Sequence, residues 1–196
     1  MNSDGKDIIE RQDGIWSTTG IASRMISALN AAKRPVPKYL QTVAASGNES
    51  NHANAAFSMS CFWTGEYELG KIDGVVSTEA GWLDGHEVTL VQFDESQLPL
   101  SSLAKKAAEV RCANKVYTDD GKSVGRLPGG KLEGYQPASD SDQKKQISRL
   151  PALYSVPGLN EMQKAKINSH ASSSTEQALQ WLSPRQRESL ANSGRR

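Results

Sequence analysis

The fold of this chain is decided by one stretch, Val75-Val76-Ser77-Thr78-Glu79-Ala80-Gly81-Trp82-Leu83-Asp84-Gly85-His86-Glu87-Val88-Thr89-Leu90-Val91-Gln92-Phe93. Residues 75–80 contain β-branched side chains, which favour strands. Residues 87–93 alternate between two faces, as a second strand would. Between them, Leu83-Asp84-Gly85-His86 contains a glycine that allows the positive φ of a tight hairpin turn. The stretch therefore predicts a β-hairpin.

The residues on either side of this hairpin complete a βαββαβ unit. A strand and a helix are expected before it, and a helix and a strand after it, at residues 56–62, 64–72, 99–111 and 113–117. This order is the ferredoxin-like, split βαβ pattern. Right-handed crossovers then give the strand order 4-1-3-2, with every neighbouring pair antiparallel. We therefore expect an α+β fold with a ferredoxin-like core.

Helical segments are expected on both sides of this core. Helices are predicted near 21–29 and 38–45, and a last helix is predicted to begin at Ser183-Pro184, with Gln186 completing its cap. The stretch before position 150 is rich in Gly, Lys, Asp and Ser, which is typical of a linker. The expected division is a helical N-terminal extension and linker (1–55), an α+β domain (56–118), a flexible linker (119–149) and a helical C-terminal tail (150–196).

The composition narrows the possible partners. The 196 residues carry 23 basic and 22 acidic side chains, a net charge of +1, which argues against a dedicated nucleic-acid binder. No apolar run approaches the ~20 residues of a membrane span, and residues 1–7 lack the apolar stretch of a secretory signal. We therefore expect no nucleic-acid partner, no membrane and a cytoplasmic location.

Two cysteines, Cys61 and Cys112, are the candidates for chemistry. They are too few for a four-thiolate metal site, and we expect neither a metal nor a cofactor. Cys61 lies where a strand is expected to meet a helix, and the free N–H groups of a helix N-terminus stabilise a thiolate. Phe62 and Trp63 follow at once and are expected to wall an apolar pocket. The alternative is that Cys61 is a small buried apolar residue.

The expected topology brings the two cysteines together. In the 4-1-3-2 order, the end of the first strand, the turn from Trp82 to His86 and the end of the second helix share one edge of the sheet. Cys61 and Cys112 should then lie at the same end of adjacent strands, one to two times the ~7 Å that a disulfide allows between Cα atoms. Cys112 could resolve an oxidised Cys61, or it could be an apolar residue at a helix end.

Several segments resemble the peptide methionine sulfoxide reductase A family. They are Cys61-Phe62-Trp63, residues 73–88 and Val91-Gln92-Phe93-Asp94, in that order. The family's nucleophile motif is Gly-Cys-Phe-Trp; a helix, a Pro-Gly-Val strand, a Gly-Tyr turn, a Gly-His-X-Glu-X-Val segment and a Tyr/Phe-Asp-Pro strand end follow it. The resemblance covers about residues 56–110.

The resemblance implies an oxidoreductase acting on methionine sulfoxide in peptide or free form. Cys61 would attack the sulfoxide sulfur and become a sulfenic acid, while Phe62 and Trp63 hold the substrate methyl group. A second thiol is then needed, and a thioredoxin-like protein would be the reductant. Cys112 is assigned as this second thiol by geometry and not by the family, whose resolving cysteines usually lie in a C-terminal tail.

The proton donor is left open. Ser60 replaces the family's glycine, Trp82 stands where the family has a tyrosine that binds the sulfoxide oxygen, and the loop with the family's catalytic glutamate is absent. Glu66 and Glu87 are the possible acids, and His86 could orient the thiolate or donate a proton near neutral pH. Glu68 and Asp84 are further carboxylates in reach. His86 could equally be an exposed turn residue.

A different class of function also fits the strand order. Heavy-metal-associated domains place cysteine where their first strand meets their first helix, but they need two thiolates three residues apart. Here Thr64 occupies the second position. The alternative to a reductase is therefore a catalytically degenerate domain that acts as a binding or metal-handling module.

Overall fold

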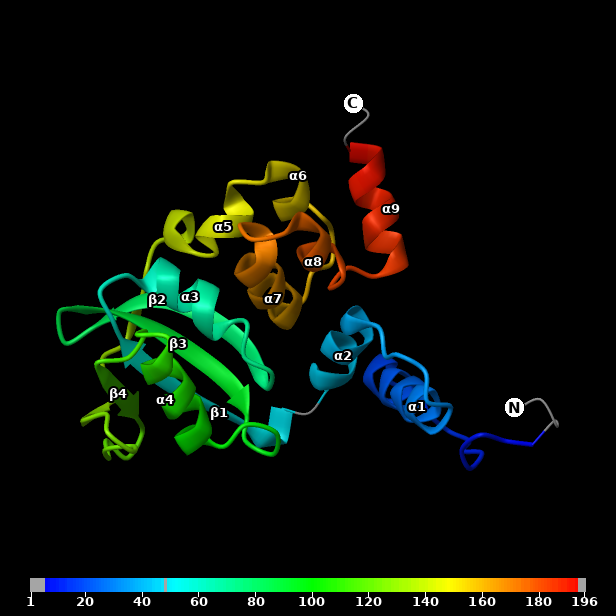
Figure 1. Ribbon diagram of the computed structural model, residues 1–196, viewed down its shortest axis with the longest axis horizontal. Helices are drawn as coiled ribbons and strands as arrows, with labels where there is room; N and C mark the ends of the chain where they lie inside the picture. Colours follow the sequence, from blue (N-terminus) through cyan, green and yellow to red (C-terminus); the bar gives the residue numbers. More distant parts are fainter. Residues whose placement is uncertain (1–5, 48, 194–196) are drawn as a thin grey trace.

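The computed structural model describes residues 6–47 and 49–193, and it shows a mixed α/β protein. Part of the stretch without secretory-signal features, residues 1–5, lies outside them. The described strands form one six-stranded sheet in the order β5-β4-β1-β3-β2-β6 (Figure 1). Only the β4–β5 pair is parallel. The strands are β1 (His52–Ser58), β2 (Val75–Leu83), β3 (His86–Asp94), β4 (Lys115–Thr118), β5 (Gly129–Lys131) and β6 (Gln136–Pro137).

Helices α3 (Phe62–Leu69) and α4 (Leu100–Glu109) cover the same face of the sheet (Figure 1). The main core lies between them and the central strands. It contains apolar side chains of β1, β3 and β4 together with residues of both helices, which include Ala55, Phe57, Val91, Phe93, Val116, Leu69, Leu103 and Ala107. A smaller cluster on the opposite face joins Ala56, Leu83, Val88 and Tyr117. Both faces of the central strands are therefore packed.

The β2–β3 hairpin forms where the sequence predicts it. Leu83 pairs with His86, and the two residues between them have positive φ angles of 52° at Asp84 and 74° at Gly85. This combination matches the right-handed twist of the flanking strands. Strand β2 extends to Leu83, three residues beyond its expected end at Ala80. The exposed Trp82 is thus part of a strand and not of the turn.

The first strand lies earlier in the chain than predicted. It ends at Ser58, whereas 56–62 was expected, so Cys61 follows the strand by three residues. The observed strand contains three alanines, at positions 53, 55 and 56, and alanine has little strand preference. Ala55 and Ala56 are completely buried, because small side chains leave room for the layers on both faces. Packing therefore overrides local preference here.

Residues 119–149, expected to be a flexible linker, carry regular structure instead. Strand β5 pairs with β4, and β6 pairs with β2 at Gly81 and Trp82. The segment also contains a 3₁₀ turn (Asp140–Asp142) and helix α5 (Lys145–Ser148). Leu132 and Tyr135 pack against the smaller cluster of the sheet. The polar composition of residues 119–149 gave no sign of these strand pairings, because backbone groups form most of them.

The C-terminal helices gather around α7 (Glu161–Ala171), whose buried side chains are largely polar. Lys166 Nζ donates to the carbonyl oxygens of Gly70 (2.9 Å) and Ile72 (2.7 Å) after the end of α3. Asn168 Oδ1 accepts from the N–H groups of Gln146 and Ile147 at the start of α5. Helix α7 thus binds backbone groups just after the end of α3 and at the start of α5. The remaining helices here are α6 (Pro151–Tyr154), α8 (Thr175–Leu179) and α9 (Pro184–Ser193).

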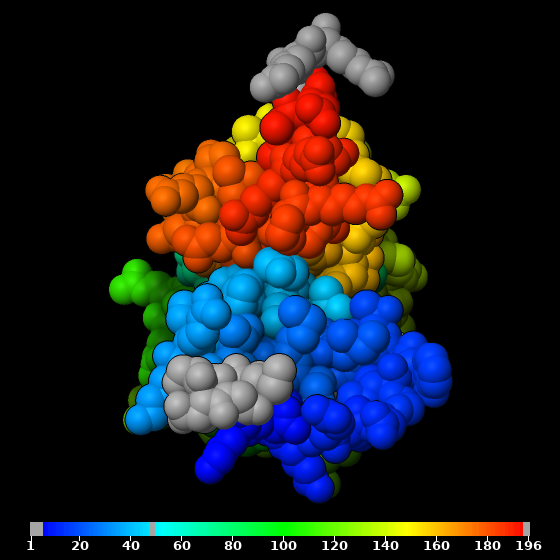
Figure 2. All heavy atoms as spheres, turned by 90° about the vertical axis from the view of Figure 1, so that its right-hand side faces the viewer, coloured from blue at the N-terminus to red at the C-terminus, as the bar shows by residue number. Residues whose placement is uncertain are grey.

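The N-terminal helices α1 (Thr18–Ala31) and α2 (Lys38–Ala45) pack on each other and lie beneath the C-terminal helices in Figure 2. Helix α2 has the expected bounds. The predicted cap of α9 also forms, because Ser183 and Gln186 exchange side-chain to backbone hydrogen bonds. No helix among the described residues is long and apolar enough to cross a membrane.

Candidate active site around Cys61

Cys61 is the N-cap residue of α3 and has a partly exposed, free thiol. Its backbone is extended, with φ −156°, and its carbonyl oxygen accepts the first hydrogen bonds of the helix, from Thr64 and Gly65. The thiol therefore lies at the helix N-terminus, where backbone N–H groups carry partial positive charge.

A glycine lets the first turn of α3 lie directly on β3. A Cβ atom at Gly65 would overlap Thr89 Oγ1 and Met59 Sδ. The Thr89 hydroxyl donates to the carbonyl oxygen of Phe62 at 3.2 Å. The helix start is thus fixed against the strand that also carries Glu87.

Glu87 places a carboxylate at the same helix N-terminus. Its Oε2 atom accepts a hydrogen bond of 2.8 Å from the backbone N–H of Phe62, the residue after Cys61. The side chain is only partly exposed. Of the two acids proposed from sequence, Glu87 is therefore the one bound to a group adjacent to the nucleophile candidate.

Glu66, the other proposed acid, is occupied elsewhere. Its carboxylate is 0% exposed and forms an ion pair of 2.6 Å with Lys144 Nζ, while its second oxygen accepts from the Lys144 backbone N–H at 2.8 Å. Burial raises the pKa of Glu66, although the charge and hydrogen bonds of Lys144 oppose that rise. Both carboxylate oxygens are thus directed to Lys144, and Glu66 has a role in packing the site.

Three aromatic side chains gather beside Cys61. The Phe62 ring centroid lies 5.8 Å from that of Trp63 and 5.5 Å from that of Trp82, which it meets edge-to-face. Phe62 is 5% exposed, whereas Trp82 is 44% exposed and forms the open side of the group. Ala80 and Ala138 complete the cluster. The structure therefore brings together the three side chains that the sequence assigned to substrate binding.

The sequence did not indicate residues 138–145, which form one wall of this cluster. Trp63 Nε1 donates to the carbonyl oxygen of Asp142 at 3.0 Å, and Lys145 Nζ lies 4.9 Å from the centre of the Trp63 ring. The Gln143 side chain hydrogen-bonds both the N–H and the carbonyl group of Ala80. These contacts use backbone carbonyls and amides, which leave no motif in the sequence.

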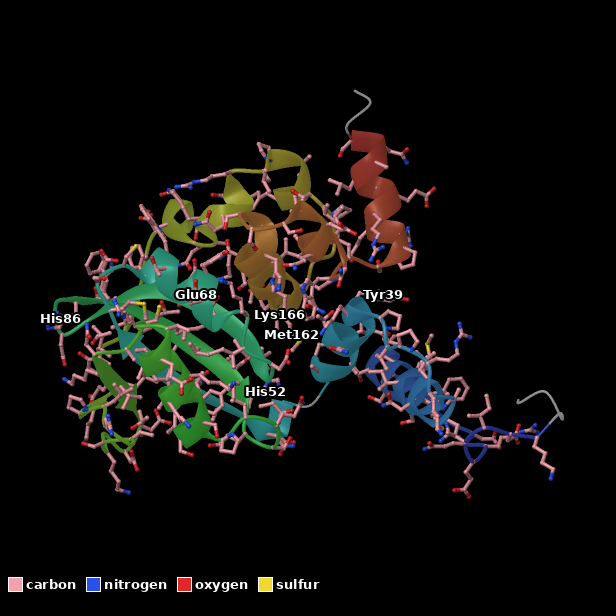
Figure 3. All side chains as sticks on the ribbon, in the orientation of Figure 1. Tyr39, His52, Glu68, His86, Met162 and Lys166 are labelled. Carbon is pink, nitrogen blue, oxygen red and sulfur yellow. The ribbon has the colours of Figure 1, made fainter. Side chains whose placement is uncertain are left out.

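His86 lies at the outer tip of the β2–β3 hairpin and is exposed, in the position that the alternative interpretation gave it (Figure 3). Glu68 lies on α3, where it pairs with Lys71 at 3.0 Å. Asp84, in the hairpin turn, pairs with Lys115 at 3.2 Å. Glu68 and Asp84 thus form ion pairs with lysines, and His86 is exposed to solvent. The contact with the start of α3 is made by Glu87.

Cys112 is 1% exposed and lies between α4 and β4. Ser58 of β1 pairs with Lys115 of β4, so each cysteine lies three residues from the same pair of residues and at the same end of the two strands. Burial raises the pKa of Cys112 to about 11, and the charges of Glu68 and Cys61 add to this rise. Cys112 is therefore a protonated thiol at neutral pH, within the electrostatic influence of Cys61.

No protein-family model matches the chain, and no curated protein matches it.

Selective alkylation should separate the two thiols. In the native protein at pH 7, iodoacetamide is expected to modify Cys61 at least about tenfold faster than Cys112, because only a thiolate reacts and Cys112 is buried with a raised pKa. The rate at Cys112 should rise about tenfold per pH unit while the protein stays folded. Peptide mass spectrometry measures both rates. Equal rates at pH 7 would contradict the assignment of Cys61 as the more reactive thiol.

Among the described residues, no group of three or more His, Cys, Asp or Glu side chains is arranged to hold a metal ion. The chemistry that the arrangement supports is that of a thiol at a helix N-terminus, beside a carboxylate and an aromatic cluster.

Proposed function

We propose that this protein is an oxidoreductase that reduces methionine sulfoxide, in peptide or free form, with Cys61 as its nucleophile. The observation that carries the proposal is the contact between Glu87 and the N–H of Phe62, because it gathers an acid, a partly exposed thiol and an aromatic cluster at one helix N-terminus. The resemblance of residues 56–110 to the peptide methionine sulfoxide reductase A family points to the same activity.

We also propose that the core of the fold is ferredoxin-like. Strands β4-β1-β3-β2 are consecutive in the sheet, each is antiparallel to its neighbour, and α3 and α4 pack on one of their faces. In this interpretation, β5 and β6 are additions to the two edges.

In the proposed first step, the Cys61 thiolate attacks the sulfoxide sulfur. Glu87 transfers a proton to the sulfoxide oxygen, and Oε1 is the oxygen available for this because Oε2 accepts from Phe62 N. The hydroxyl group passes to the Cys61 sulfur as the original S–O bond breaks. The bond between the Cys61 sulfur and the substrate sulfur then breaks. Methionine leaves as a thioether, reduced by two electrons, and Cys61 becomes a sulfenic acid, oxidised by two electrons. The aromatic cluster of Phe62, Trp63 and Trp82 would hold the methyl group.

In the second step, the Cys112 sulfur loses its proton and attacks the sulfenic sulfur of Cys61. A disulfide forms and water leaves with the Cys112 proton. The position of Cys112 at the same end of the adjacent strand supports this role. A dithiol protein of the thioredoxin type then reduces the disulfide by thiol–disulfide exchange and returns both thiols. Such a cycle suits the cytoplasm, which keeps thiols reduced.

A single-turnover experiment tests this proposal. Reduced protein is mixed with excess N-acetylmethionine sulfoxide without any reductant. The wild type should form one equivalent of the thioether and lose both free thiols. Cys112→Ser should also form one equivalent but lose only one thiol, with the sulfenic acid on Cys61 trapped by dimedone. Product is measured by chromatography and thiols by a colorimetric reagent. Failure of the wild type to form any thioether would refute the proposed function.

A further inference from the structure

A buried ion pair connects α3 to the wall of the aromatic cluster. Glu66 lies one helical turn after Phe62 and Trp63, and both its carboxylate oxygens bind Lys144. Lys144 Nζ also donates to the carbonyl oxygen of Thr78 in β2. One lysine therefore holds the segment before α5 to both the helix and the strand that carry the aromatic residues.

Lys144 itself is in an unusual backbone conformation for a lysine. Its φ is +47° and its ψ is +50°, in the left-handed region that favours glycine. A side chain other than glycine persists there when its surroundings hold it. The ion pair and the burial of the Lys144 side chain supply that restraint. The conformation turns the chain so that Gln143 and Asp142 face the site.

The two residues before Lys144 act on the site directly. Asp142 presents its carbonyl oxygen to the indole N–H of Trp63, and Gln143 binds both backbone groups of Ala80. Residues 142–144 thus attach in succession to Trp63, to β2 and to Glu66. A displacement of Lys144 would release the acceptor that orients Trp63.

We propose that the Glu66–Lys144 ion pair is a positioning device that orients Trp63 and so sets the arrangement of the aromatic cluster proposed to hold the substrate methyl group. The inference rests on the proposed function only for its kinetic consequence. Glu66 and Lys144 bind each other, and Lys144 also binds the carbonyl oxygen of Thr78. They act through the carbonyl oxygen of Asp142, which fixes the ring of Trp63 against Phe62.

A positioning role and a merely stabilising role predict different effects on KM and kcat. If the pair orients Trp63, its loss loosens the aromatic cluster and weakens substrate binding, while Cys61 and Glu87 remain in place at the helix N-terminus. The KM for the sulfoxide then rises and kcat changes little. A pair that only stabilised the fold would alter neither constant in the folded protein.

The test replaces both members of the pair, because Lys144→Met alone leaves a buried carboxylate without a partner and threatens folding. The variant is Glu66→Leu/Lys144→Met. The matched control is Lys164→Met, which removes an exposed ion pair of 2.7 Å with Glu161 on α7. Circular dichroism first establishes that both proteins are folded.

Fluorine NMR of protein labelled with 5-fluorotryptophan then reports on Trp63. The chain has four tryptophans, and Trp63→Phe identifies the signal of interest. In the double variant this signal should shift or broaden, and the KM for N-acetylmethionine sulfoxide should rise about tenfold with kcat within about twofold. The control should match the wild type in all three measurements.

An unchanged Trp63 signal in the folded double variant would overturn the proposal, as would a fall in kcat at constant KM. Should the wild type reduce no sulfoxide, the proposed function fails, and the fluorine signal alone decides whether the pair positions Trp63. A shifted signal then supports the positioning role, and an unshifted one refutes it.

Discussion

Cys61→Ser is expected to abolish methionine sulfoxide reduction. The rate of thioether formation from N-acetylmethionine sulfoxide, with dithiothreitol as reductant, should fall at least about a thousandfold, to the background of the buffer. A serine hydroxyl is a far weaker nucleophile than a thiolate, because it is almost never deprotonated near neutral pH. It also cannot form the sulfenic acid that the proposed cycle requires.

Cys112→Ser is the matched control for this prediction, since it makes the same chemical change in the other thiol. It should retain the first turnover, because in the proposed cycle Cys112 acts only after the thioether has left. Turnover by Cys61→Ser at more than a small fraction of the wild-type rate would mean that another group attacks the sulfoxide. The thiol at the N-cap of α3 would then be structural.

Glu87→Gln should slow the first turnover by about 10²–10⁴-fold, the range measured when a positioned acid is lost. The substitution keeps an oxygen that can accept from Phe62 N, so the start of α3 should keep its geometry. What is lost is the transferable proton. Rapid-quench measurement of the first equivalent of thioether isolates this step from reduction of the disulfide.

Glu68→Gln provides the control for Glu87→Gln. Glu68 is also a carboxylate near α3, but it pairs with Lys71 and influences Cys112, not the helix start. Its first turnover should therefore equal that of the wild type. Equal rates for Glu87→Gln and the wild type would remove Glu87 from the mechanism and leave its contact with Phe62 as a helix cap.

Local signals in the sequence predicted the elements that depend on local chemistry. Asp84-Gly85 determined the hairpin turn, and Ser183-Pro184 with Gln186 determined the start of α9. The predicted position of β1 was wrong because the buried positions of this strand need small side chains, which have little strand preference. Ala55 and Ala56 lie between packed layers, and nothing in an alanine-rich stretch distinguishes a buried strand from a helix.

The residues of the candidate site also fall into two groups: those that the sequence indicates and those that only the tertiary structure shows. Cys61, Phe62 and Trp63 are consecutive, and the hairpin carries Trp82 and Glu87 to them, so sequence and topology together identify these five. The sequence could not show that both Glu66 oxygens bind Lys144, because Lys144 lies 78 residues away. In the sequence, Lys144 belongs to a polar stretch typical of a solvated linker. Only the tertiary structure shows that its ammonium group is buried against a carboxylate.

The residues that pack against Glu66 of α3 lie far downstream in the sequence, and this separation has a consequence during translation. Glu66 receives Lys144 from 78 residues downstream, and Ser169 reaches the Glu66 carbonyl oxygen from 103 residues downstream. At roughly 5–20 residues per second, a ribosome needs about 5–20 s to supply that much chain. During this time residues 61–69 exist without Lys144 and Ser169, which bind Glu66 in the folded protein. The Cys61 thiol is therefore synthesised before the residues that complete the aromatic cluster next to it.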